Sequence, residues 1–178
     1  MSRVGVEYYN SLLKDALNKK LNKQVETKAP AFYFWGKSLI PIHYISNSTD
    51  RFSFYTKIHR ARKEKDLEDI NSELRDRYGK IPKETESFVR LAKLSILYKG
   101  SLVESVSIGE TSLVFKIPNT FNSGGDLLIP KILSYKSKNI TKKSFKESAG
   151  SVSVVFSTKV GYNWFSELLN CISLFYKT

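Results

Sequence analysis

Apolar residues in the first hundred positions recur mainly at three- and four-residue steps, the spacing of one face of an α-helix. This pattern predicts an amphipathic helix over residues 6–22, a second helical block that starts near Asp50, a helix from Asp66 to about residue 78, and another over residues 83–98. The N-terminal half is therefore predicted to be mainly helical.

Two of these helices carry more specific signals. In the block near Asp50, the predicted apolar face consists of Phe52, Tyr55, Ile58 and His59. The next helix has Asp66 as its predicted N-cap and an apolar stripe of Leu67, Ile70 and Leu74. Gly79 can adopt the left-handed conformation that ends a helix, and Pro82 prevents its continuation.

Residues 25–49 separate the first helix from the others. They combine a polar stretch, predicted to be a linker, with the aromatic and apolar sequence AFYFWGKSLIPIHYI, which lacks helical periodicity. The second part is predicted to be an extended arm with one or two short strands. Pro41 would restrict any such strand to the edge of a sheet.

After Gly100 the apolar period changes from helical spacing to alternation. Residues 102–117 predict a β-hairpin that turns near Gly109, and two further strands are predicted on either side of Gly150. A short helix near Pro130 and a final amphipathic helix from Trp164 complete the pattern. The predicted fold is α+β: a helical N-terminal half, then a small, mainly antiparallel sheet covered by helices.

The composition is that of a globular protein, and its positive net charge suits an anionic partner. Hydrophobic residues make up 41% and aromatic residues 13% of the 178 positions, and the formal net charge is +12. Such a charge favours nucleic acid as a partner, although a Lys-rich proteome would give the same excess. No apolar run is long enough to cross a membrane, so no membrane partner is expected. A single cysteine, Cys171, is typical of a reducing, cytoplasmic setting.

Lysines are most concentrated in residues 131–147, with Tyr135 and Phe145 among them. The candidates for phosphate binding there are Lys136, Lys138, Lys142, Lys143 and Lys146. This strip could follow a nucleic-acid backbone. The alternative is an ordinary edge strand, where lysine discourages pairing with other chains.

The sequence offers little for catalysis. Gly124 and Gly125 lack the lysine and the spacing of a phosphate-binding loop. The two histidines and the one cysteine have no metal-ligand spacing, and no serine lies in a nucleophile motif. We therefore expect the chain alone to have no enzymatic activity, no catalytic residues, no metal and no cofactor.

Several motifs occur in the order and at the distances of one known family. They are GVEYYNSLLKDA (residues 5–16), RFSFYTKI (51–58), DLEDINSELRDRYGKIP (66–82) and LAKL (91–94). Together they resemble the C-terminal domain of the bacterial transcription-repair coupling factor, Mfd. The similarity is specific over about residues 5–108; beyond residue 118 only the order of elements corresponds.

The resemblance implies a non-catalytic regulatory domain. Intact family members are ATP- and Mg-dependent double-stranded-DNA translocases that displace stalled RNA polymerase and recruit the repair protein UvrA. Their C-terminal domain folds back on an N-terminal module similar to UvrB and masks the UvrA-binding surface. By this resemblance, residues 1–24 would form the helix leading from the motor region, 25–49 the linker and arm, and 50–178 the regulatory domain.

The resemblance also points to two residues. The family's two acids that face arginines of the UvrB-like module correspond to Glu73 and Asp76. A spacing of three residues places both on one helix face. The alternative from spacing alone is that Arg77 and Lys80 pair with these acids locally.

Overall fold

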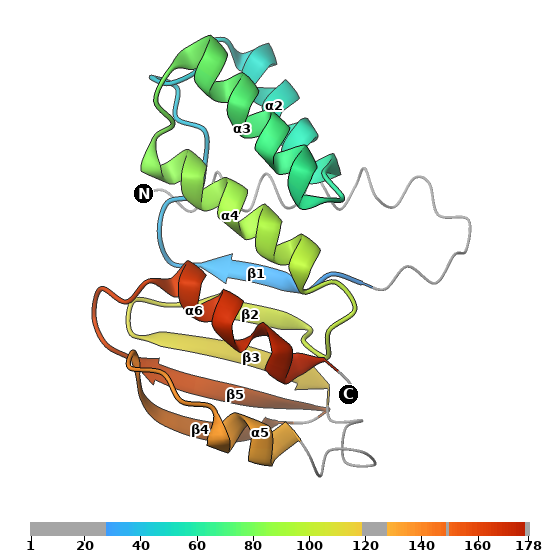
Figure 1. The fold of residues 1–178 in the computed structure, drawn as a ribbon, viewed down its shortest axis with the longest axis vertical. Helices are drawn as coiled ribbons and strands as arrows, with labels where there is room; N and C mark the ends of the chain where they lie inside the picture. The colour runs from blue at the N-terminus through green and yellow to red at the C-terminus, as the bar shows by residue number, and fades with distance from the viewer. Residues whose placement is uncertain (1–27, 119–127, 149, 177–178) are drawn as a thin grey trace, which may run out of the picture.

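The computed structural model describes residues 28–118, 128–148 and 150–176, and all structural statements below concern these residues (Figure 1). The elements, in chain order, are β1 (Ala31–Phe34), α2 (Ser48–Arg60), α3 (Glu64–Tyr78), α4 (Lys83–Leu97), β2 (Ser105–Ile108), β3 (Ser112–Pro118), α5 (Leu128–Ser134), β4 (Ile140–Ser148), β5 (Ser151–Thr158), α6 (Trp164–Cys171) and the 3₁₀-helix η3 (Ile172–Phe175). This order confirms the α+β prediction. The helix predicted over residues 6–22 lies outside the described residues.

The strands form one five-stranded sheet in the order β1-β2-β3-β5-β4. Strand β1 pairs in parallel with β2, and all other neighbours are antiparallel. The predicted hairpin is present as β2 with β3. The two strands predicted on either side of Gly150 are also present, and they pair with each other as β4 and β5; Gly150 between them has a φ of 81°. The prediction of a mainly antiparallel sheet is therefore confirmed.

One face of the sheet forms the larger hydrophobic core because the side chains that point to it from the central strands β2, β3 and β5 are mostly apolar. Figure 1 shows α5 and α6 in front of this face. The fully buried members of this core come from the strands and from the covering helices: Val106, Leu113, Phe115, Phe156, Ile132, Leu168, Cys171 and Phe175. The rings of Phe115 and Phe175 stack with their centroids 4.4 Å apart.

Helices α2, α3 and α4 surround a second core. Its buried residues include Phe54 and Ile58 of α2, the α3 stripe Leu67, Ile70 and Leu74, and Val89 of α4. Helix α4 also reaches the first core, where Leu94 and Tyr98 are fully buried. The Tyr98 hydroxyl donates a hydrogen bond to the Leu168 carbonyl at 2.8 Å, which joins α4 to α6.

The predicted arm belongs to both cores. Strand β1 occupies an edge of the sheet, but Pro41 lies seven residues beyond it and is not the reason for that position. After β1, Ile40 and Ile45 are buried in the second core, the one surrounded by α2, α3 and α4. The division of the chain at residue 50 stays a prediction.

The predicted apolar face of α2 was wrong in part. Phe52 is 67% exposed and His59 is exposed, whereas Phe54 is completely buried together with Ile58. Residues 52, 54, 55 and 58 are all apolar, so two stripes were compatible with the sequence. The helix turns the stripe that includes Phe54 inward because α3 and α4 pack there.

The predicted start of α3 was also wrong. The helix begins at Glu64, and Asp66 occupies its third position rather than the N-cap. The Asp66 carboxylate accepts hydrogen bonds from the backbone N–H groups of Arg62 at 2.8 Å and Lys63 at 3.0 Å, which lowers the pKa of this carboxyl group. The predicted end is confirmed: Gly79 has a φ of 77° and its N–H bonds to the Arg75 carbonyl.

Glu167 is a buried carboxylate that ties α6 to the segment before β4. Only 1% of its surface is exposed. Its two oxygens accept hydrogen bonds from the Tyr135 hydroxyl at 2.9 Å, the Ser137 hydroxyl at 2.8 Å and the Asn139 amide at 2.9 Å. All three donors are uncharged, and Glu167 lies in the first turn of α6, so neutral hydrogen bonds and the helix dipole both favour the buried carboxylate.

We predict that Glu167→Ala destabilises the fold strongly. The change removes three hydrogen bonds to a charged acceptor and leaves their donors in a confined site, for a loss of about 3 kcal/mol or more. Glu167→Gln should cost much less, because the amide keeps one acceptor and the Tyr135 hydroxyl can turn to accept from its NH₂ group. Urea unfolding of the two variants measures the difference, and equal losses would contradict this account of the site.

Candidate protein-binding site

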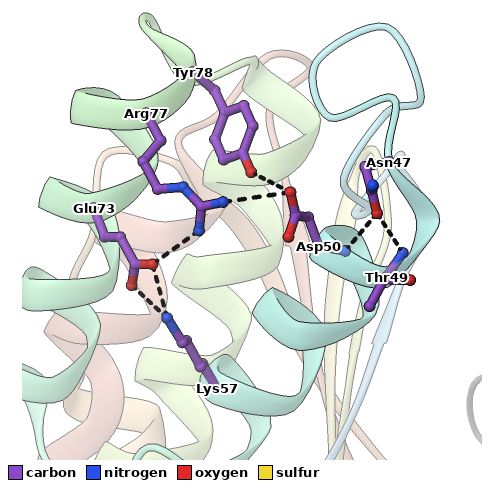
Figure 2. Close-up of polar contacts among 7 residues, drawn as sticks. All are labelled: Asn47, Thr49, Asp50, Lys57, Glu73, Arg77 and Tyr78. Atoms are coloured by element: carbon purple, nitrogen blue, oxygen red, sulfur yellow. Dashed lines mark hydrogen bonds and ion pairs between the residues drawn. The ribbon is translucent and has the colours of Figure 1, made fainter.

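Glu73 lies in the third turn of α3, and its carboxylate faces α2 (Figure 2). The Lys57 ammonium donates to both of its oxygens, at 2.6 and 2.8 Å, and Arg77 donates to one of them at 3.2 Å. The Glu73 side chain keeps 33% of its surface exposed. This acid is therefore held between two cations of its own domain and remains accessible to solvent.

Arg77 extends the same network toward the start of α2. Its second terminal nitrogen lies 3.3 Å from the Asp50 carboxylate, which also accepts a hydrogen bond from the Tyr78 hydroxyl at 3.0 Å (Figure 2). The guanidinium lies over the rings of Tyr78 and Phe54, 5.0 and 5.6 Å from their centroids. These contacts fix the position of Arg77 more firmly than an isolated surface ion pair would.

The network balances its charges. Lys57 and Arg77 match Glu73 and Asp50, so the four groups carry no net charge together. The hydrogen bond from Lys57 is the main cause that lowers the pKa of Glu73, and Arg77 acts in the same direction. The exposure of all four side chains limits what the pairs contribute to stability.

Asp76 differs from Glu73. Its side chain is exposed at the last turn of α3 and, among the described residues, makes no hydrogen bond or ion pair. The predicted local pairing is thus present for Glu73 with Arg77 and absent for Asp76 with Lys80. Sequence reasoning missed Lys57 because it lies 16 residues before Glu73, on another helix.

The five candidate phosphate-binding lysines do not form one strip. Lys143 points to the helix-covered side, where its ammonium donates to the carbonyls of Ile132, Leu133 and Tyr135 at the end of α5. Burial lowers the pKa of this lysine. The other four lysines are exposed: Lys142 and Lys146 on β4, and Lys136 and Lys138 in the segment before it. Lys143 thus caps a helix and is not available on the outer surface.

Other chemistry has little support in the described part of the chain. No group of three His, Cys, Asp or Glu side chains there could hold a metal ion. Burial raises the pKa of the Cys171 thiol to about 12, so the thiol stays protonated and unreactive at neutral pH. No helix among the described residues is long and apolar enough to span a membrane.

Comparisons with known proteins agree with the fold and the motifs. A family model, the TRCF domain, matches residues 36–125. The chain is 27% identical over 149 residues to the transcription-repair-coupling factor of Borreliella burgdorferi, covering 82% of this chain and 13% of that protein. It is 31% identical over 107 residues to the factor of Escherichia coli, covering 53% of this chain and 9% of that protein.

A solved structure, the crystal structure of the C-terminal domain of transcription-repair coupling factor, has the same fold. Its TM-score is 0.65 at 16% sequence identity, over 85% of this chain and 92% of that one. The chain belongs to the TRCF-domain family and corresponds to the C-terminal domain of transcription-repair coupling factors. It spans about an eighth or less of the length of these curated relatives.

The Glu73 network predicts a pH dependence of stability. Because its cationic partners lower the folded-state pKa of Glu73, its contribution is present above the unfolded pKa and is lost as the pH falls through the folded value. Glu73→Gln should therefore lower the melting temperature slightly at neutral pH and leave it unchanged at the most acidic pH, so that the acid limb of a plot of melting temperature against pH becomes flatter. An acid limb identical to that of the unmodified chain would contradict this assignment.

Proposed function

We propose that this domain represses the coupling factor by an intramolecular contact: Asp76 and Glu73 of α3 bind arginine side chains of an N-terminal, UvrB-like module and cover its UvrA-binding surface. The observation that supports this most directly is Asp76. It is an exposed acid without a described partner on a chain of net charge +12, and it lies within the motif that carries the family resemblance.

Glu73 suits a reversible contact. Its bonds to Lys57 and Arg77 link partly exposed side chains, and solvent screening leaves such pairs little net contribution to stability. An arginine of the partner could replace one of them at little cost, and the released lysine or arginine would return to solvent. We therefore assign to Asp76 an ion pair that forms only with the partner module. Glu73 would instead exchange one of its own cations for an arginine of that module.

The remaining activities belong to the intact protein in this proposal. ATP and Mg would act in its motor region, which would move along double-stranded DNA and displace RNA polymerase. The contact through α3 would be released when the polymerase is bound, and UvrA could then reach its surface. The domain itself would contribute binding and no catalysis.

The proposal predicts that Asp76→Ala in the intact coupling factor strengthens UvrA binding. Loss of one partner-facing acid should weaken the repressing contact and raise the apparent UvrA affinity by roughly tenfold, within the usual range of coupling energies. Glu73→Gln should have a smaller effect, because Glu73 already has internal partners, and the double variant the largest. The measurement is UvrA binding by fluorescence anisotropy or calorimetry.

Glu68→Ala is the matched control, since Glu68 is another exposed acid of α3 outside the proposed contact. It should leave UvrA affinity unchanged. Unchanged affinity in the Asp76→Ala and double variants, or an equal gain in the control, would rule out the assignment of these two acids.

A further inference from the structure

On the second face of the sheet, the side chains named below are all exposed or half-buried. Away from the β4–β5 turn, its residues follow from the strand register: Ala31 and Tyr33 of β1, Ser105 and Ser107 of β2, Ser112, Val114 and Lys116 of β3, Ser153, Val155 and Ser157 of β5, and Lys142, Ser144 and Lys146 of β4. We call this set the open face. Most of its side chains are small, and most of the small ones are serines with a hydroxyl group. It also has three lysines and no acidic residue.

The lysines of the open face are arranged regularly. Ser153 pairs with Lys116 on one side and with Lys146 on the other, so these three residues form a row across β3, β5 and β4. Adjacent strands are about 4.8 Å apart, which places the two lysine Cα atoms about 10 Å from each other. Lys142 lies four residues before Lys146 on β4, about 13 Å along the strand, opposite Ser157.

Acidic side chains neutralise little of the positive charge on the open face. The nearest acid to Lys116 is Glu104, whose carboxylate lies 4.0 Å from the ammonium in a pair with both side chains about half exposed. Such a pair is weak and easily exchanged. Among the described contacts, Lys142 and Lys146 have no ion pair.

The side chains of the open face favour one class of partner over the others. A protein interface needs apolar or aromatic anchors at its centre, and here the centre offers only Val114 and Val155. A single strand of nucleic acid needs aromatic platforms along its path, and the exposed aromatic residues here, Tyr33 and Trp35, are confined to edge strand β1 and the turn after it, at the opposite edge of the sheet from β4. A duplex backbone needs only cations and hydrogen-bond donors, which lysines and serines supply.

We propose that the open face binds the phosphate backbone of double-stranded nucleic acid without sequence preference, with Lys116, Lys142 and Lys146 as its charged contacts. The site is distinct from α3 and does not depend on the regulatory contact proposed above. The site differs from the lysine strip predicted from the sequence. Lys116 is added, Lys143 is excluded because it caps α5, and Lys136 and Lys138 lie outside it in the segment before β4.

The first test measures binding of the 178-residue chain to a labelled DNA duplex between about 50 and 200 mM salt. A triple variant with Lys116→Gln, Lys142→Gln and Lys146→Gln should weaken binding at least tenfold at the lower salt concentration. The slope of log affinity against log salt should fall in magnitude by about 2.7, since each phosphate contact contributes about 0.9. Circular dichroism and thermal melting check that the variant is folded.

Two control variants separate this site from general charge. Lys65→Gln, Lys80→Gln and Lys99→Gln together remove the same charge from exposed positions elsewhere, and Lys136→Gln with Lys138→Gln tests the neighbouring segment. Both controls should bind DNA almost as well as the unmodified chain. A loss in either control equal to that of the triple variant would overturn the proposal, as would absence of binding at low salt or tighter binding to polyglutamate than to DNA.

A single substitution gives an independent test that a folding defect cannot imitate. Ser153→Glu places a carboxylate directly between Lys116 and Lys146, where opposite charges on neighbouring strands attract. The variant should melt at the same or a higher temperature than the unmodified chain and yet lose DNA affinity by tenfold or more. Unchanged DNA affinity in a folded Ser153→Glu variant would overturn the proposal.

Discussion

The architecture depends on α4, which belongs to two hydrophobic cores at once. Its first half contributes Val89 to the second core, which α2, α3 and α4 surround. Its second half leads to Leu94 and Tyr98, which are buried in the larger core on the sheet. Tyr98 also donates a buried hydrogen bond to the Leu168 carbonyl of α6. Because one rigid helix serves both cores, the position of α2 and α3 is coupled to the position of the sheet.

This coupling matters for the site on α3. The stripe Leu67, Ile70 and Leu74 is buried against α2 and α4, so the outer side of α3 cannot turn independently of the rest of the domain. Asn47 caps α2 with its side chain and thereby fixes the turn that carries Asp50 (Figure 2). Asp50 in turn positions Arg77, and Arg77 positions Glu73. A polar network on the surface is thus held by the apolar core beneath it.

Most elements were predictable from the sequence because their signals are local. Alternation gave the β2–β3 hairpin, and Gly79 with Pro82 gave the end of α3. The errors came where local signals allowed two answers. Four apolar residues in α2 permitted two stripes, and the packing of α3 and α4, which is remote in sequence, selected the one with Phe54.

The candidate sites, too, could be predicted only as far as local sequence signals reach. The motif on α3 identified Glu73 and Asp76, but their different surroundings depend on Lys57 of another helix. The lysines of residues 131–147 were visible as a cluster, yet the alternation of β4 sends Lys143 to one side of the sheet and Lys142 and Lys146 to the other. Charge density along a chain therefore does not define a surface until the strand register is known.

The two proposed surfaces have opposite chemistry and lie on different parts of the fold. Asp76 presents an acid on the helical part, whereas Lys116, Lys142 and Lys146 present cations on the open face of the sheet. Neither surface shares a residue with the other, so neither partner would displace the other by direct competition for the same side chains. Any influence of one partner on the other would have to pass through α4, the helix that packs in both cores. If both proposals hold, the domain would bind an arginine-bearing protein module and a nucleic-acid backbone as separate events.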